Sequence, residues 1–257
     1  MTEAGPRPRS PLFLWEGGWC MLAPHLHNRP HSHVAASLLV SLSGEPIRVQ
    51  LAGHWISAQA VWAAPDVDQA LDSDGPVAVL HLDPDHRAWR ALRLQGPGGE
   101  FPLAAHPLFS ERLNALAVSP SAPSALSLRA ALEAGEPRPL DPRVVLACRA
   151  LRRGDDAALS GAALADAVGL SESRFRHLFR EELGVNLKRF QLHLKCQRAL
   201  TLWRDGMSLT DLALAAGFYD QPHLNRTLRA MFDTLPSRYA RAFPIQVEHL
   251  DGPRLHE

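Results

Sequence analysis

The sequence predicts an α+β protein of two domains: a small N-terminal β-barrel with following helices, and a C-terminal all-α domain with two helix-turn-helix units. Three observations lead to this prediction. Short apolar runs bounded by Gly, Pro and Asp fill the first third of the chain. Apolar residues at three- and four-residue spacing take over after residue 85. An apolar helix, a glycine turn and a second apolar helix then occur twice, with Gly169 and Gly217 48 residues apart.

Composition limits the class of protein. A chain of 257 residues with 46% apolar and 21% charged residues suits two ordinary globular domains. No run of about 18 apolar residues is present, so no membrane span is expected. The N-terminus lacks the apolar core of a secretory signal. Three scattered cysteines favour a reducing compartment and exclude a Cys-based zinc site, so a cytoplasmic location is expected.

The formal charge of zero hides an asymmetry between the two halves. Residues 1–140 hold 10 Lys/Arg and 13 Asp/Glu, a net charge of −3, whereas residues 141–243 hold 16 and 11, a net charge of +5. A basic C-terminal half beside an acidic N-terminal half is typical of one nucleic-acid-binding domain joined to a domain with another role.

Residues 1–11 are rich in Pro, Arg and Gly and are expected to be disordered. The first domain is expected over residues 12–134. Its predicted strands are apolar runs of strand length: 12–22, 36–44, 47–53, 60–65 and 77–84. Its predicted helices follow, at 86–94, 107–118 and 124–135. A segment with three prolines, 135–142, is the expected linker.

The second domain is expected over residues 143–243, followed by a tail at 244–257 without a strong pattern. Asp141 and Pro142 mark the start of its first helix. Further helices are predicted at 160–169, 171–183, 185–204, 208–217, 219–232 and 235–243, several of them with Ser at the N-cap and Gly at the end. Pro222 fits only the first turn of its helix, which must therefore start near Asp220.

The second helix of each unit has the two faces that DNA reading requires. An apolar face holds the helix at its angle, and a polar face enters the major groove. The polar residues expected to contact bases or phosphates are Ser173, Arg176, His177 and Arg180 in the first unit, and Gln221, His223, Asn225, Arg226 and Arg229 in the second. The helix predicted from about residue 185 to 204 should span about 30 Å. Adjacent major-groove segments are about 34 Å apart, so one chain could straddle them.

The C-terminal region resembles the DNA-binding domain of the AraC/XylS family of transcription regulators. The resemblance rests on LADAVGLSESRFRHLFREELG (164–184) and on LTDLALAAGFYDQPHLNRTLRAMFDTLPSRYAR (209–241). Pro222 stands where the family usually has Ser, and Lys195 where it often has Arg. The resemblance implies a sequence-specific regulator of transcription, not an enzyme, that binds double-stranded DNA, acts as a homodimer, and contacts RNA polymerase if it is an activator. Regulators of this family often carry an N-terminal barrel that senses a small molecule or mediates dimerisation.

Four histidines gather in HLHNRPHSH (25–33). The spacing H31-x-H33-x3-S37-x6-G44 resembles the first motif of cupin barrels, with Ser37 where a metal-binding Glu would stand. His31 and His33 alternate on one strand face and are the weak metal candidates, although no cofactor or bound metal is expected. The expected small-molecule site is the mouth of the cupin-like barrel, with His31, His33, Trp55 and Trp62 as candidate contacts. Trp15 and Trp19 are two further tryptophans that could line it.

Two other functions remain open from the sequence. A metal-dependent cupin enzyme with an accessory helical domain is the main alternative, and an architectural DNA-binding protein without an effector is a third. The sequence contains no P-loop, no G-x-G-x-x-G and no G-x-S-x-G, which weakens the enzymatic alternatives.

Overall fold

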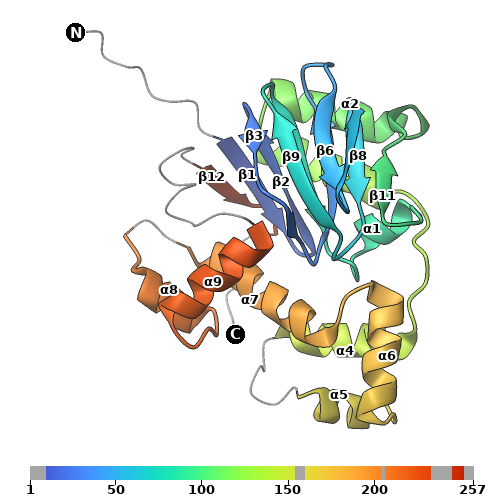
Figure 1. Ribbon diagram of the computed structural model, residues 1–257, viewed down its shortest axis with the longest axis vertical. Coiled ribbons are helices and arrows are strands. Elements are labelled where there is room, and N and C mark those ends of the chain that lie inside the picture. The colour runs from blue at the N-terminus through green and yellow to red at the C-terminus, as the bar shows by residue number, and fades with distance from the viewer. Residues whose placement is uncertain (1–9, 154–159, 204–205, 233–244, 252–257) are drawn as a thin grey trace. The chain divides into compact units, whose positions relative to one another are not determined.

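The computed structural model describes residues 10–153, 160–203, 206–232 and 245–251 (Figure 1). The chain divides into two compact units, residues 1–137 with 232–257, and residues 138–231. The second unit is therefore inserted in the sequence of the first.

The first unit contains two β-sheets that together form a small barrel. A seven-stranded sheet has the order β11-β8-β5-β10-β2-β1-β12, and a five-stranded sheet has the order β3-β9-β6-β7 with β4 also paired to β9. The strands are β1 (Ser10–Trp15), β2 (Gly18–Ala23), β3 (Leu26–His27), β4 (His31–Ser32), β5 (Ala36–Ser41), β6 (Ile47–Leu51), β7 (His54–Ala58), β8 (Ala60–Ala63), β9 (Asp68–Ser73), β10 (Val77–Leu82), β11 (Gly98–Glu100) and β12 (Ile245–His249). β1 pairs with β12 in parallel, while the other pairs are antiparallel.

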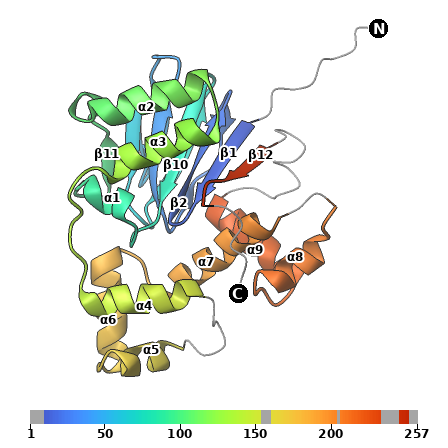
Figure 2. The same cartoon turned by 180° about the vertical axis from the view of Figure 1, so that it is seen from behind.

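Helices cover the outer face of the seven-stranded sheet. They are α1 (Arg87–Ala91), a short 3-10 turn (Leu103–Ala105), α2 (Pro107–Val118) and α3 (Ala122–Glu133). Figure 2 shows α2 and α3 lying across this sheet. Because side chains alternate along a strand, Leu38 and Leu80 pack against the helices, whereas Leu39 and His81 face the barrel interior. The fold thus separates a helix-facing core from the interior of the barrel.

The second unit is helical throughout its described part. Its helices are α4 (Pro142–Arg153), α5 (Gly161–Ala167), α6 (Glu172–Leu183), α7 (Leu187–Leu202), α8 (Leu209–Ala215) and α9 (Gln221–Phe232). Side chains at the N-caps accept hydrogen bonds from backbone N–H groups of the first turn at Ser160, Ser171, Asn186 and Ser208.

The predicted fold class is confirmed, with three corrections. The apolar run 12–22, expected as one strand, forms the antiparallel strands β1 and β2, because the chain turns at Gly17, which has φ of 81°. α7 has 16 residues instead of the expected 20, because it begins only after the N-cap Asn186 and ends at Leu202. Its length is about 24 Å instead of 30 Å, about 10 Å short of the distance between adjacent major-groove segments, so the helix length does not by itself support the expected straddling of two segments. The tail, expected to have no pattern, contains β12, which pairs with a strand more than 230 residues earlier and so leaves little local signal. The helix predicted at 235–243 lies outside the described residues. In the described part of the chain no helix is long and apolar enough to span a membrane.

Candidate nucleic-acid interface

The first helix-turn-helix is built from α5, a glycine turn and α6. Gly169 has φ of 67°, a left-handed conformation that side chains disfavour, and its N–H donates to the carbonyl of Asp166. Ser171 then caps α6, and Gly184, with φ of 76°, ends it. The local turn chemistry therefore fixes both ends of the predicted reading helix.

α6 has one buried and one exposed face. Phe175 and Phe179 are fully buried, and Leu183 is nearly so. The four side chains predicted to contact DNA all lie exposed: Ser173, Arg176, His177 and Arg180. Their spacing of three, one and three residues places them together on one helix face, as a groove-reading surface requires.

Arg176 is already engaged in an ion pair on this face. Its guanidinium donates to a carboxylate oxygen of Glu172, one helical turn earlier, with an Nε–Oε1 distance of 2.9 Å. A Cβ on Gly161 would lie 2.9 Å from Arg176 and 2.8 Å from Glu172, so the small residue at the start of α5 makes room for the pair. The carboxylate orients Arg176 but also occupies guanidinium N–H groups that could otherwise donate to guanine or phosphate.

The second helix-turn-helix repeats the design with a different support. Gly217 has φ of 83°, and the N–H of Phe218 donates to the carbonyl of Ala213 over 2.8 Å. Lys195, which projects from α7, donates from Nζ to the carbonyl of Gly217 over 2.7 Å. α7 therefore supports the turn of the second helix-turn-helix. The sequence showed only that Lys195 stands where the family often has Arg, and it did not predict this role.

The start of α9 agrees with the constraint set by Pro222. Asp220 accepts a hydrogen bond from the N–H of His223 over 2.6 Å and so caps the helix one residue before it begins. Gln221 accepts from the hydroxyl of Thr210 in α8 over 3.1 Å. The His223 ring lies edge-on to Phe218, with centroids 5.3 Å apart.

The predicted contacts of α9 differ in accessibility. Arg226 and Arg229 are exposed, whereas Gln221, His223 and Asn225 are half-buried. Within the described structure the side-chain oxygen of Asn225 is buried without a hydrogen-bond partner. Leu224 and Leu228 form the buried face, as expected, while the side chain of Phe232, expected beside them, lies outside the description. The two arginines are therefore the most available cations on this helix.

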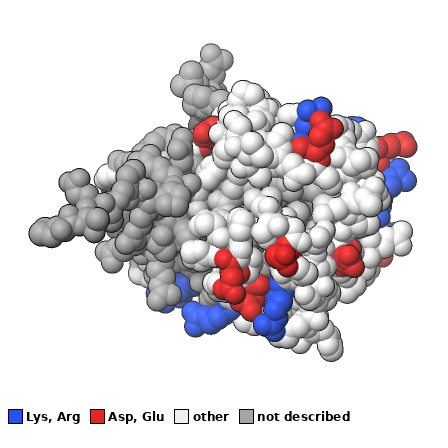
Figure 3. All heavy atoms as spheres, turned by 90° about the horizontal axis from the view of Figure 1, so that it is seen from above, with Lys and Arg blue, Asp and Glu red and all other residues white. Residues whose placement is uncertain are grey.

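The described part of the face drawn in Figure 3 shows no second basic surface that could bind nucleic acid. There, Lys, Arg, Asp and Glu lie scattered among uncharged side chains, and no basic patch gathers among the residues described.

A small hollow of about 20 Å³, room for about one water molecule, lies inside the barrel of the first unit. Both sheets and the segment before β5 contribute to its polar lining, which consists of Asn28, His31, His33, Ser37, Gln69 and His81. Its apolar lining consists of Leu26, Leu39, Leu71 and Val79. Polar groups inside an apolar wall are the usual makeup of a small-molecule site.

The two histidines of the H-x-H motif hydrogen-bond to each other in this hollow. His31 Nδ1 lies 2.7 Å from the carbonyl of Arg29, which can only accept, so Nδ1 carries a proton. In neutral His31, Nε2 is then the acceptor for the Nε2–H of His33, 2.7 Å away. The His33 ring packs edge-on against His81, with centroids 3.9 Å apart.

These residues do not fit the metal that a cupin motif implies. Ser37 replaces the carboxylate ligand, and its hydroxyl accepts a hydrogen bond from Gln69 over 2.6 Å. The facing nitrogens of His31 and His33 are committed to their mutual hydrogen bond. Among the residues described, no group of three or more His, Cys, Asp or Glu side chains is placed to hold a metal ion.

The two tryptophans predicted as ligand contacts lie away from the hollow. Trp55 is 49% exposed on β7, where the Arg48 guanidinium stacks 4.7 Å from its ring centroid. Trp62 is buried on the helix-facing side of its sheet, 6.0 Å from Trp89. Trp19, also expected to line the barrel, stacks against one of the lining residues, His81, with ring centroids 4.0 Å apart.

Comparisons with known proteins concern both units. A family model described as "Helix-turn-helix domain", of the AraC type, matches residues 164–242. The structure of ToxT from Vibrio cholerae O395 has a TM-score of 0.57 at 10% identity, over 87% of this chain and 97% of that chain. Wild-type ToxT of strain SCE256 with a bound unsaturated fatty acid gives 0.54 at 11% identity, over 87% and 94%. At these identities the likeness to ToxT shows a shared fold.

Sequence similarity is higher to a shorter protein. An AraC-type transcriptional regulator from Chromobacterium violaceum is 30% identical over 40% of this chain and 95% of that chain, with a TM-score of 0.36. No curated protein sequence matches the chain.

Proposed function

The chain belongs to the AraC/XylS family of DNA-binding transcription regulators, and we propose on this basis that it is a one-component regulator that reads a specific DNA sequence under the control of its N-terminal unit. The observation that carries the proposal is the exposed stripe of Ser173, Arg176, His177 and Arg180 on a helix whose opposite face is buried.

The two reading helices take different roles in this proposal. Arg176 makes a bidentate contact to guanine with N–H groups that its ion pair with Glu172 releases or leaves available. His177 donates to an acceptor on a neighbouring base. On α9, Arg226 and Arg229 contact bases or phosphates, while the half-buried Gln221, His223 and Asn225 serve the edges of the same interface.

The effector site of this proposal is the hollow. Its paired histidines, with Ser37 and Gln69, supply donors and acceptors, and its leucines supply apolar contact. A hollow of this size holds about one water molecule, so an effector with several heavy atoms must widen it, and the polar lining favours an effector with at least one hydrogen-bonding group. ToxT, which shares the fold, has been captured with a bound unsaturated fatty acid, which supports a small-molecule ligand for this protein. Dimerisation through the first unit is the alternative mode of control, and RNA polymerase is a partner if the protein activates transcription.

Selection of binding sites from random duplexes tests DNA reading. We expect an enriched motif, bound less tightly by Arg176→Ala and by Arg226→Ala by about 1–3 kcal/mol each. Arg149→Ala, which removes an exposed arginine from α4, is the matched control and should leave the base preference unchanged. No enriched motif, or variants of α6 and α9 with unchanged affinity and preference, would overturn the proposal.

The effector is tested separately by thermal unfolding with a panel of small polar and amphipathic molecules. A true ligand stabilises the wild type but not His33→Ala, whereas Trp55→Ala, outside the hollow, keeps the response. A ligand whose effect survives His33→Ala binds elsewhere. Sedimentation measures the oligomeric state of the protein with and without that ligand. A change in oligomeric state on ligand binding would indicate control by dimerisation.

A further inference from the structure

One buried acceptor in the wall of the hollow lacks a donor among the described residues. Gln69, on β9, is 4% exposed, and its Nε2 donates to the hydroxyl of Ser37 on β5 over 2.6 Å. The Oε1 atom of the same amide is buried without a hydrogen-bond partner in the part of the chain that the structure describes. A buried carbonyl oxygen without a donor destabilises a fold, so a group in the hollow that bonds to Gln69 stabilises the barrel.

The bond between Gln69 and Ser37 joins the two sheets, because β9 belongs to the five-stranded sheet and β5 to the seven-stranded sheet. The Ser37 hydroxyl accepts this bond and keeps its own proton, which it can donate to a second group. The group that fits between these two side chains must therefore both donate and accept. A hydroxyl does so in either orientation of the Gln69 amide.

The lining of the hollow favours a neutral group over a charged one. Among the described residues it contains no Asp, Glu, Lys or Arg side chain. The facing nitrogens of His31 and His33 already bond to each other. A buried ammonium group would meet no carboxylate here, and a buried carboxylate would have to bring a proton onto the histidines. Because an unpaired buried charge is far more costly than a hydrogen-bonded hydroxyl, an acid or an amine fits this site poorly.

The seven-stranded wall of the hollow is held in place at the end of β10. The carbonyl of Gly17, in the turn before β2, accepts a hydrogen bond from the N–H of Asp83, which directly follows β10. The His86 ring lies against Gly17, where a Cβ would approach it to 2.3 Å. β10 carries His81 into the lining and pairs it with Ser37 in the sheet register. The position of the Ser37 hydroxyl is therefore fixed before any ligand binds.

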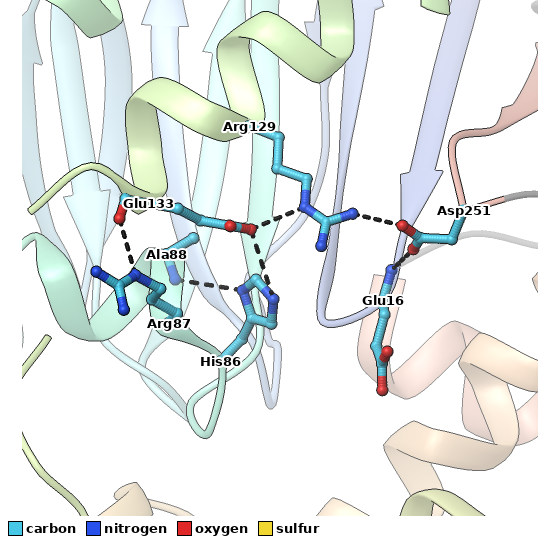
Figure 4. Close-up of polar contacts among 7 residues, drawn as sticks. All are labelled: Glu16, His86, Arg87, Ala88, Arg129, Glu133 and Asp251. Atoms are coloured by element: carbon cyan, nitrogen blue, oxygen red, sulfur yellow. Dashed lines mark hydrogen bonds and ion pairs between the residues drawn. The ribbon is translucent and has the colours of Figure 1, made fainter.

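A polar network on α3 supports this end of the sheet (Figure 4). Glu133 lies 3.8 Å from Nε2 of His86 and accepts a hydrogen bond from Arg129 over 2.8 Å. Arg129 also donates to Asp251, which follows β12 and accepts from the N–H of Glu16. The opposite wall contains β3 and β4, which have only two residues each. The widening that the rest of an effector requires is therefore expected on that side.

We propose that the hollow is a hydroxyl site: it binds one water molecule, and a neutral hydroxyl group of the effector replaces that water on Gln69 and Ser37. Its volume of about 20 Å³ suits one group of this size. A ligand group gains affinity from such a replacement only if it reproduces the hydrogen bonds of the water, which a hydroxyl does. This inference rests on the proposed function and names the effector class as an alcohol.

Water is the first probe of the site. Nuclear Overhauser measurements in solution should show one long-lived water beside the methyl groups of Leu39, Leu71 and Val79, which line the hollow. A wild-type protein without a long-lived water at these methyl groups would overturn the proposal.

Two variants show whether the polar pair holds that water. Gln69→Leu should remove the water signal, and Ser37→Ala, a smaller change, should remove it by a second route if the first variant does not fold. Gln50→Leu is the matched control: it lies on the neighbouring strand β6, where its amide donates to the carbonyl of Gly53 outside the hollow. Folded variants of Gln69 and Ser37 that keep the water would sink the assignment.

Three probes with one three-carbon chain test the class of effector: 1-propanol, propanoate and propylammonium. At pH 7 we expect 1-propanol to displace the water and shift the lining methyl signals at a concentration at least about fivefold lower than the other two, about the effect of one hydrogen bond. Gln69→Leu should lose this preference. A lower effective concentration for propanoate or propylammonium, or displacement by none of the three, overturns the proposal.

Failure of the hydroxyl site and failure of the proposed function give different results. A wild type that binds no specific duplex overturns the proposed function, whereas the water and the three probes still judge the site. An acid or amine effector from the thermal panel, with a response that is lost in Gln69→Leu, overturns the hydroxyl site and leaves the regulator standing.

Discussion

The ion pair between Glu172 and Arg176 leads to a prediction opposite to that of most interface mutations. Glu172→Gln removes the carboxylate that occupies Arg176 and also removes a negative charge from the surface that we propose to face DNA. The two side chains are 43% and 53% exposed, and such pairs contribute about 0.2–1 kcal/mol. Releasing Arg176 should therefore strengthen specific DNA binding by about 1.4- to fivefold, since 1.4 kcal/mol corresponds to a factor of ten.

Fluorescence anisotropy with the selected duplex at fixed salt measures this gain. Glu181→Gln is the comparison, because it removes the same charge from the same helix but is 3.8 Å from His177 instead of the arginine. Denaturant unfolding of both variants corrects for the favourable position of Glu172 in the first turn of α6, worth about 0.3–1 kcal/mol. Weaker binding by Glu172→Gln than by Glu181→Gln would instead show that Glu172 positions Arg176 for its contact.

Three further predictions concern the support of the site. Lys195→Met, which keeps the side-chain length but loses the bond to the Gly217 carbonyl, should weaken specific DNA binding more than it destabilises the fold; equal losses in anisotropy and in unfolding would contradict a positioning role. Phe175→Ala, at a fully buried site, should lower the free energy of unfolding by about 3–5 kcal/mol in a denaturant titration, and a loss below 1 kcal/mol would show that α6 is not packed as described. Burial raises the pKa of the Cys20 and Cys196 thiols to about 12, so both should resist alkylation at pH 8 until the protein unfolds; rapid labelling of the native protein would disprove their burial.

Local signals explain why the C-terminal domain could be predicted in detail. Gly169 and Gly217 end their helices in the left-handed conformation that a glycine after an apolar helix indicates. The exposed stripe on α6 follows from three- and four-residue spacing alone. The ion pair between Glu172 and Arg176 could also be predicted from the sequence, because residues four apart on a helix lie side by side on one face.

The first unit depends on contacts that sequence patterns do not specify. β9 reads DQALDS and β7 reads HWISA, whose polar residues hide the strand signal. Trp62 faces the helices because of its position in the alternation of side chains along β8. A shift of one residue would have pointed it into the barrel, and the sequence does not fix that choice. β12 is short, and its partner strand is distant in the sequence, so its pairing could not be predicted locally.

Footprinting of the protein on its selected site shows whether both helix-turn-helix units of one chain read DNA. If each unit occupies its own major-groove segment, we expect two protected clusters about 10 base pairs apart on one face of the duplex. Arg176→Ala should weaken one cluster and Arg226→Ala the other. A single cluster, or two variants that weaken the same cluster, would contradict the reading of DNA by both units.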